Sequence, residues 1–143
     1  MRETTLRGKL IKNILYPRLL SIPAIEHSRQ CEASTRQELA KEIGVKIEKC
    51  GLFIDAEFPY LGASPDGLIG EDGIVEIKCP FSAKNISSEE AFQKKIGNLH
   101  KIFDPHTDVE MNKKHEYYYQ VQGQLHVTKR QYCIFYIWIR KAA

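Results

Sequence analysis

The chain has 143 residues, of which 43% are hydrophobic and 27% charged, so it is long enough for a single folded domain, residues 1–143, with its own core. This composition excludes a disordered or collagen-like chain, and no apolar run approaches the roughly 18–20 residues that cross a membrane. The net charge is only +3, and the four cysteines lie singly, which predicts reduced thiols in an intracellular protein, nuclear in a eukaryote and cytoplasmic in a bacterium or phage.

Two helices are predicted in the N-terminal part of the chain. Apolar residues recur at helical spacing over residues 6–16, and Pro17 would end that helix. Ser21-Ile22-Pro23 is a typical helix start. It predicts a second helix from about Ala24 to Ile43, with Gly44 as its C-terminal cap.

A β-hairpin is predicted in the centre of the chain, after two short strands at residues 45–50 and 52–54. Its turn is Gly70-Glu71-Asp72-Gly73, because glycine adopts backbone angles that other residues resist and aspartate favours turns. The arms of the hairpin are then residues 68–69 and 74–78.

Three charged side chains gather on this hairpin. Folding about the turn brings Asp66 to within about one residue of the position opposite Glu76. Because side chains alternate in face along a strand, Val75 and Ile77 enter a core while Glu76 and Lys78 share the other face. Two carboxylates and one ammonium group that converge in this way are suited to metal-assisted cleavage of a phosphodiester.

The residue types also match that chemistry. Mg²⁺, with Mn²⁺ as a substitute, prefers carboxylate, carbonyl and water oxygens, so Asp66, Glu76 and the carbonyl group of Ile77 are its predicted ligands. Lys78 would hold the attacking water and offset charge on the phosphate. A lone Glu-x-Lys is more often a cross-strand ion pair, and Ser-Pro-Asp-Gly alone is more often a turn. Their combination at hairpin spacing favours the metal site.

The C-terminal half continues the same pattern. Residues 87–96 are predicted as a short helix capped by Ser87, and residues 97–114 as a long loop without periodicity. Residues 115–127 are predicted as a helix and residues 131–139 as a buried strand. The predicted fold class is therefore α/β, with a mixed central β-sheet flanked by helices.

Four strings of this sequence, His27–Glu32, Phe58–Leu68, Val75–Pro80 and Tyr117–Thr128, resemble the YqaJ-type viral recombinases, relatives of phage lambda exonuclease within the PD-(D/E)xK nuclease superfamily. The resemblance implies a restriction-endonuclease-like core and a metal-dependent deoxyribonuclease. The sequence departs from the family at Ser28, where glycine is usual. It also shows no match to the family's N-terminal segment, in which an arginine and a serine grip a 5′-phosphate, so we expect part of that segment to be lacking.

The resemblance adds Glu32 to the predicted site as a further ligand of the metal, direct or through water. We expect Glu32 near the N-terminal end of the second helix, where the helix dipole favours an anion. Glu26 and Glu38 are the nearby alternatives, and both are expected to face solvent.

The resemblance further implies that Gln120 or Gln122 contacts the substrate phosphate or orients Lys78. Helical spacing places Gln120 and Gln124 on one face and Gln122 on another, but it does not decide which glutamine acts. An amide suits either role because it both donates and accepts hydrogen bonds.

The predicted function is Mg²⁺-dependent hydrolysis of DNA, as an exonuclease on duplex ends in recombination, a mobile element or a virus. Basic residues toward both ends of the chain suit a phosphate backbone, although solvated surfaces carry such residues too. A single-strand annealing protein and further copies of the chain are additional candidate partners, and no membrane contact is expected. Two alternatives are a truncated or domesticated copy that binds DNA or a protein with little or no cleavage, and a site-specific endonuclease on the same core.

Overall fold

The structure is a computed structural model that describes residues 22–83, 86–104, 106 and 110–139. The helix predicted for residues 6–16 lies outside these residues. The helix predicted next is confirmed as α2 (Pro23–Ile43), with Pro23 in its first turn. It ends at Gly44, whose left-handed backbone (φ +66°) is one that glycine adopts without steric cost.

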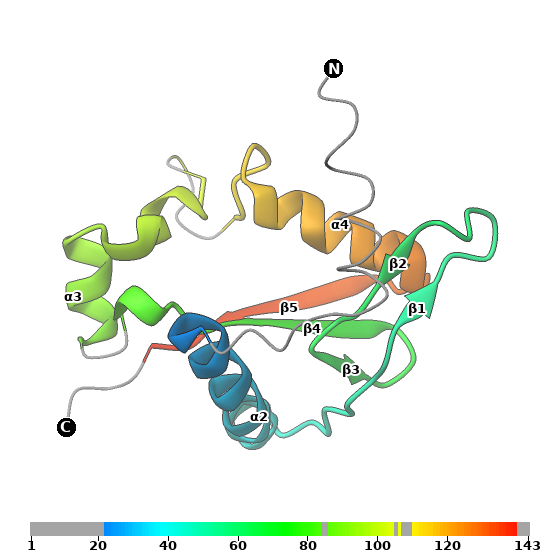
Figure 1. Cartoon of the computed structure of the whole chain (residues 1–143), viewed down its shortest axis with the longest axis horizontal. Helices are drawn as coiled ribbons and strands as arrows, with labels where there is room; N and C mark the ends of the chain where they lie inside the picture. The colour runs from blue at the N-terminus through cyan, green and yellow to red at the C-terminus, as the bar shows by residue number, and fades with distance from the viewer. Residues whose placement is uncertain (1–21, 84–85, 105, 107–109, 140–143) are drawn as a thin grey trace.

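The central sheet has three strands, in the order β3 (Gly67–Ile69), β4 (Gly73–Lys78) and β5 (Tyr132–Ile137). Strands β3 and β4 form the predicted antiparallel hairpin, whereas β4 and β5 run parallel, so the sheet is mixed as the sequence predicts. A separate antiparallel pair, β1 (Phe53–Ile54) and β2 (Gly62–Ala63), lies beside it (Figure 1).

Helices cover both faces of the β4–β5 pair: α2 lies on one side and α4 (Glu116–Thr128) on the other (Figure 1). On the α2 side, Leu39 packs with Val75 and Ile77 of β4 in an apolar core. Strand β5 alternates between two cores. Ile134 and Tyr136 pack toward α2, while Phe135 and Ile137 pack against a second cluster around Ala83, Ala91, Leu99 and Ile102.

In the segment that forms the second cluster, two boundaries differ from those predicted from the sequence. Helix α3 spans Ser88–Gln93, so it ends before Ile96. The segment predicted as a loop from residue 97 begins instead with a 3-10 helix, η2 (Ile96–Lys101), which follows the short 3-10 helix η1 (Phe81–Ala83). Leu99 of this 3-10 helix is buried in the second cluster. Tertiary packing thus stabilises a helical turn in a segment whose sequence has no helical periodicity.

The segment at residues 45–50 also differs from its prediction as a strand. This segment forms a single β-bridge, between Glu48 and Leu68. The Glu48 N–H donates to the Leu68 carbonyl (2.9 Å), and the Leu68 N–H donates to the Glu48 carbonyl (2.8 Å). This bridge brings the backbone of β3 close to Ile47: a Cβ atom on Gly67 would lie 2.4 Å from Ile47 Cγ2. Glycine after Asp66 is therefore required by close packing. Among the described helices, none is long and apolar enough to cross a membrane.

Candidate active site

Strands β3 and β4 hold Asp66 and Glu76 opposite each other, as the hairpin spacing predicts. Gly67 pairs with Val75, and the Asp66 N–H donates to the Val75 carbonyl (2.9 Å), which extends the ladder by one residue. Lys78 follows on the same face of β4 as Glu76. The three charged groups of the sequence motif thus come from one rigid hairpin.

Glu76 is the most enclosed of these groups, with 3% of its surface exposed. Its Oε1 atom accepts from Lys78 Nζ (2.6 Å) and from Gln120 Nε2 (2.7 Å). Its Oε2 atom accepts from Gln124 Nε2 (2.8 Å). Both oxygens of this carboxylate are therefore fixed, one by a cation and an amide and the other by an amide alone.

Lys78 is held from three directions. Besides Glu76, its ammonium group donates to Gln120 Oε1 (3.0 Å) and lies 4.6 Å from the centre of the Tyr117 ring. The Gln120 amide closes a triangle, since it donates to the carboxylate and accepts from the ammonium. This arrangement fixes a long, flexible side chain at the edge of the carboxylate pair.

Asp66 has a different environment from Glu76. Its Oδ2 atom accepts one backbone N–H, from Ile77 (2.7 Å), and its carbonyl group accepts from Arg36 Nη1 (2.8 Å). Burial, followed by the negative charges of Glu76 and Glu32, raises the pKa of Asp66 to about 6, although the Ile77 N–H and Lys78 oppose the shift. The carboxylates of the site lie close enough to repel one another.

Glu32 belongs to this acidic group, but it does not lie near the N-terminal end of its helix, as we expected from the sequence. Helix α2 begins at Pro23, so Glu32 lies more than two turns inside the helix, beyond the reach of the N-terminal dipole. Its partner is Arg36, one turn later (3.4 Å), which also binds the Asp66 carbonyl. Of the alternatives, Glu38 accepts from Trp138 Nε1 (3.0 Å), and Glu26 is exposed.

Asp66 and Glu76 offer two carboxylates to a divalent ion. Within the described part of the chain, no three His, Cys, Asp or Glu side chains are grouped closely enough to hold a metal by themselves. Mg²⁺ does not need such a cage, since it commonly takes one or two carboxylates and keeps several waters. Burial and, after it, the neighbouring carboxylates disfavour the charge of Asp66, and a bound cation would offset both effects, so Asp66 and Glu76 fit this ion. The metal-ligand roles of Glu32 and of the Ile77 carbonyl stay predictions.

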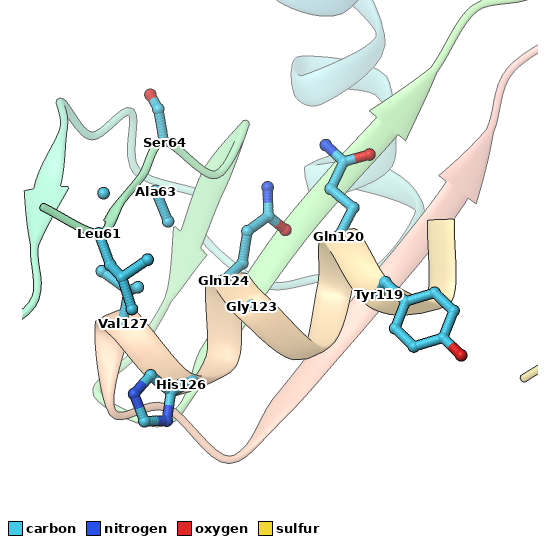
Figure 2. Close-up of a pocket in the computed structure, with 10 residues that line it drawn as sticks. Leu61, Ala63, Ser64, Tyr119, Gln120, Gly123, Gln124, His126 and Val127 are labelled. Carbon is cyan, nitrogen blue, oxygen red and sulfur yellow. The ribbon is translucent and has the colours of Figure 1, made fainter. Parts of the chain in front are cut away.

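Helix α4 brings Gln120 to the site but not Gln122. The side chain of Gln122 is exposed, whereas Gln124 is buried against Glu76, because residues four apart share a helix face. Between α4 and the β2 segment lies a pocket of about 440 Å³, lined on the helix side by Gln120 and Gln124 and on the other side by Ala63 and Ser64 (Figure 2). The catalytic role predicted for Gln120 or Gln122 is thus better supported for Gln120.

Comparison with known proteins agrees with this geometry. The profile of a family described as the YqaJ-like viral recombinase domain matches residues 11–131. The chain belongs to this family. Among curated protein sequences, none matches significantly.

Two solved structures resemble this YqaJ-like domain. LHK-Exo in complex with dAMP has 27% identity and a TM-score of 0.63, over 90% of this chain and 56% of that chain. A structure of the alkaline exonuclease LHK-Exo from Laribacter hongkongensis has 27% identity and a TM-score of 0.62, over 96% and 63%. The domain therefore spans less than two thirds of LHK-Exo. The predicted restriction-endonuclease-like fold is confirmed.

Two contributors to the site are absent from the sequence-based prediction. Arg36 joins α2 to the Asp66 backbone, and Gln124 binds Glu76. Each lies four residues after a predicted member of the site, Arg36 after Glu32 and Gln124 after Gln120. Both residues could therefore have been predicted as site residues from helical spacing, since residues four apart share a helix face.

Proposed function

We propose that this YqaJ-like domain is a Mg²⁺-dependent deoxyribonuclease that removes nucleotides from duplex DNA ends, with Mn²⁺ as a substitute ion, in recombination or in a mobile element or virus. The observation that carries the proposal is the convergence of Asp66, Glu76 and Lys78 with Gln120 on one hairpin and one helix. Membership of the family and the likeness to an alkaline exonuclease support it.

Each side chain has a distinct task in this proposal. Asp66 and Glu76, with the Ile77 carbonyl and Glu32, would hold the metal, which when bound polarises the scissile phosphate and lowers the pKa of a water. Lys78 donates to the attacking water and to the phosphate as negative charge develops there. Gln120 keeps the Lys78 ammonium beside the carboxylates through its 3.0 Å hydrogen bond.

The test is incubation of the purified protein with end-labelled linear, nicked and circular duplex DNA, with and without Mg²⁺. We expect Mg²⁺-dependent loss of label from the linear duplex and an intact closed circle. Cleavage of the closed circle would instead indicate an endonuclease. Binding of DNA in Mg²⁺ without any cleavage would favour the alternative of a copy that acts by binding alone.

A further inference from the structure

The feature that the proposed mechanism leaves unused is the buried amide of Gln124. Only 6% of Gln124 is exposed, and its Nε2 atom donates to Glu76 Oε2 (2.8 Å). Lys78 and Gln120 both bind the other oxygen of the same carboxylate. Gln124 is therefore the side chain that restrains Glu76 from the side opposite Lys78.

The orientation of this amide is set by Glu76. Rotating the amide by half a turn would place its carbonyl oxygen against the Glu76 carboxylate, and two acceptors repel each other. In the observed orientation, the Gln124 Oε1 atom is buried and, within the described part of the chain, has no hydrogen-bond partner. A buried acceptor without a donor destabilises a fold and calls for an explanation.

We propose that Gln124 is a positioning residue for Glu76: it holds the carboxylate in the orientation that binds the metal, at the expense of its own unpaired carbonyl. The inference rests on the proposed function, because it concerns the ion of that site. Partners that orient a metal ligand commonly change metal affinity by about 10- to 100-fold when they are removed.

The helix explains why Gln124 and not its neighbours has this role. Gln120 lies one turn earlier on the same face, and it is solvent-exposed where it joins Glu76 to Lys78. Gln124 is buried, and it lines the pocket between α4 and β2 together with Gln120 (Figure 2). Water competes less with a buried hydrogen bond, so the Gln124 contact restrains Glu76 more firmly than an exposed contact does.

The experiment measures metal affinity directly, by calorimetry of Mn²⁺ binding to the protein without DNA. Gln124→Met keeps the length of the side chain but removes the donor, and Gln124→Asn keeps the amide but is too short to reach Glu76. We expect both variants to bind Mn²⁺ about tenfold more weakly than wild type. The matched control is Gln93→Met, at an exposed glutamine of helix α3, which should bind as wild type does.

A cleavage assay separates positioning from loss of structure. For both Gln124 variants, the Mn²⁺ concentration that gives half-maximal cleavage should rise about tenfold, while the rate at saturating Mn²⁺ falls less than about threefold. If Gln124→Met does not fold, Gln124→Asn still tests the contact, since it keeps a polar side chain at this position.

The outcomes separate this inference from the proposed function. Wild-type affinity in both Gln124 variants would overturn the inference and leave the nuclease proposal standing. Weakening by Met but not by Asn would overturn it as well, because polarity rather than the Glu76 contact would then decide. Absence of Mn²⁺ binding by wild type would overturn the metal site itself and, with it, this inference.

Discussion

Asp55 and Asp66 are two aspartates in adjacent hairpins, and their surroundings are opposite. Asp55, with 1% of its surface exposed, accepts the backbone N–H groups of Glu57 (2.8 Å) and Phe58 (2.9 Å). Its other oxygen faces His126 Nε2 of helix α4 at 3.1 Å and Nζ of Lys129, the residue after that helix, at 3.5 Å. The Phe58 N–H above all, then the Glu57 N–H, Lys129 and His126, lower the pKa of Asp55, although burial opposes them.

The side chain of Asp66 accepts one hydrogen bond, from the Ile77 N–H, and its charge is disfavoured first by burial and then by the carboxylates of Glu76 and Glu32. Its pKa rises to about 6, whereas that of Asp55 falls. Burial alone therefore does not identify a functional carboxylate in this protein. At Asp55 the fold supplies the compensating groups, whereas at Asp66 burial and two carboxylates outweigh the Ile77 N–H and Lys78. Under the proposed function, a metal ion supplies the remaining compensation at Asp66.

The largest effect should come from removing the charge of Asp66, with the same change at Asp55 as its control. Asp66→Asn should lower the cleavage rate by about 10³-fold, because a metal ligand contributes several kcal/mol to the transition state. Asp55→Asn should change the rate of the folded protein by less than about threefold, since Asp55 faces His126 and Lys129 and not the residues of the site. A single-turnover assay at saturating Mg²⁺ compares them, and similar losses in both variants would abolish the distinction.

Lys78→Ala should lower the cleavage rate by about 10²-fold or more, because a group that offsets charge in the transition state is lost. DNA affinity in Ca²⁺, which binds without activating water well, should change much less, since one contact is a small share of the electrostatic attraction. Rates and affinities are measured on the same duplex. Wild-type cleavage by this variant would reduce Lys78 to an ion-pair partner of Glu76.

The same two aspartate variants should change stability in opposite directions in metal-free buffer at pH 7.5. Asp66→Asn removes a charge that is disfavoured by burial and by the carboxylates of Glu76 and Glu32, and it should raise the Tm by about 3–6 °C. Asp55→Asn keeps an acceptor for the two backbone N–H groups but loses the ion pairs, and should lower the Tm by about 5 °C. Thermal denaturation with a chelator measures both, and a shift of the same sign in both variants would contradict the comparison.

A smaller effect is expected from pH. The folded-state pKa of Asp66, about 6, exceeds the ordinary value of an aspartate, so the folded protein binds this proton more tightly than the unfolded chain. The stability from this group is present below about pH 4 and is lost as the pH rises to about 6. The Tm advantage of Asp66→Asn should therefore be near zero at pH 4 and constant above pH 7. An advantage independent of pH would point to packing rather than charge.

Much of the fold could be predicted from local patterns in the sequence. Pro23 and Gly44 mark the two ends of α2, and the Gly-rich turn at residues 70–73 fixes the hairpin register. The 3-10 helix at Ile96–Lys101 could not be predicted, because residues distant in sequence form its packing environment. Local patterns specify ends and turns, whereas the packing of an aperiodic segment depends on the whole molecule.

The candidate site was predictable to the same extent. The convergence of Asp66, Glu76 and Lys78 could be predicted, because the three residues lie close together along the chain within one hairpin. The partners from α4 come from far along the chain, and spacing alone did not decide whether Gln120 or Gln122 reaches the site. The assignment of catalytic and ligand roles stays a prediction until the variants are measured.

The parallel pairing of β4 with β5 also has a consequence for how the protein is made. Residues 73–78 pair with residues 132–137, so the strand that carries Glu76 can pair on this side only after a much later segment has been synthesised. On the ribosome, the β3–β4 hairpin emerges with its facing carboxylates before α4 can supply Gln120 and Gln124. Pairings between distant segments also form slowly. We therefore expect the nascent chain to acquire an ordered acidic site only after residue 137 has left the exit tunnel, which would delay any cleavage of DNA until synthesis of this region is complete.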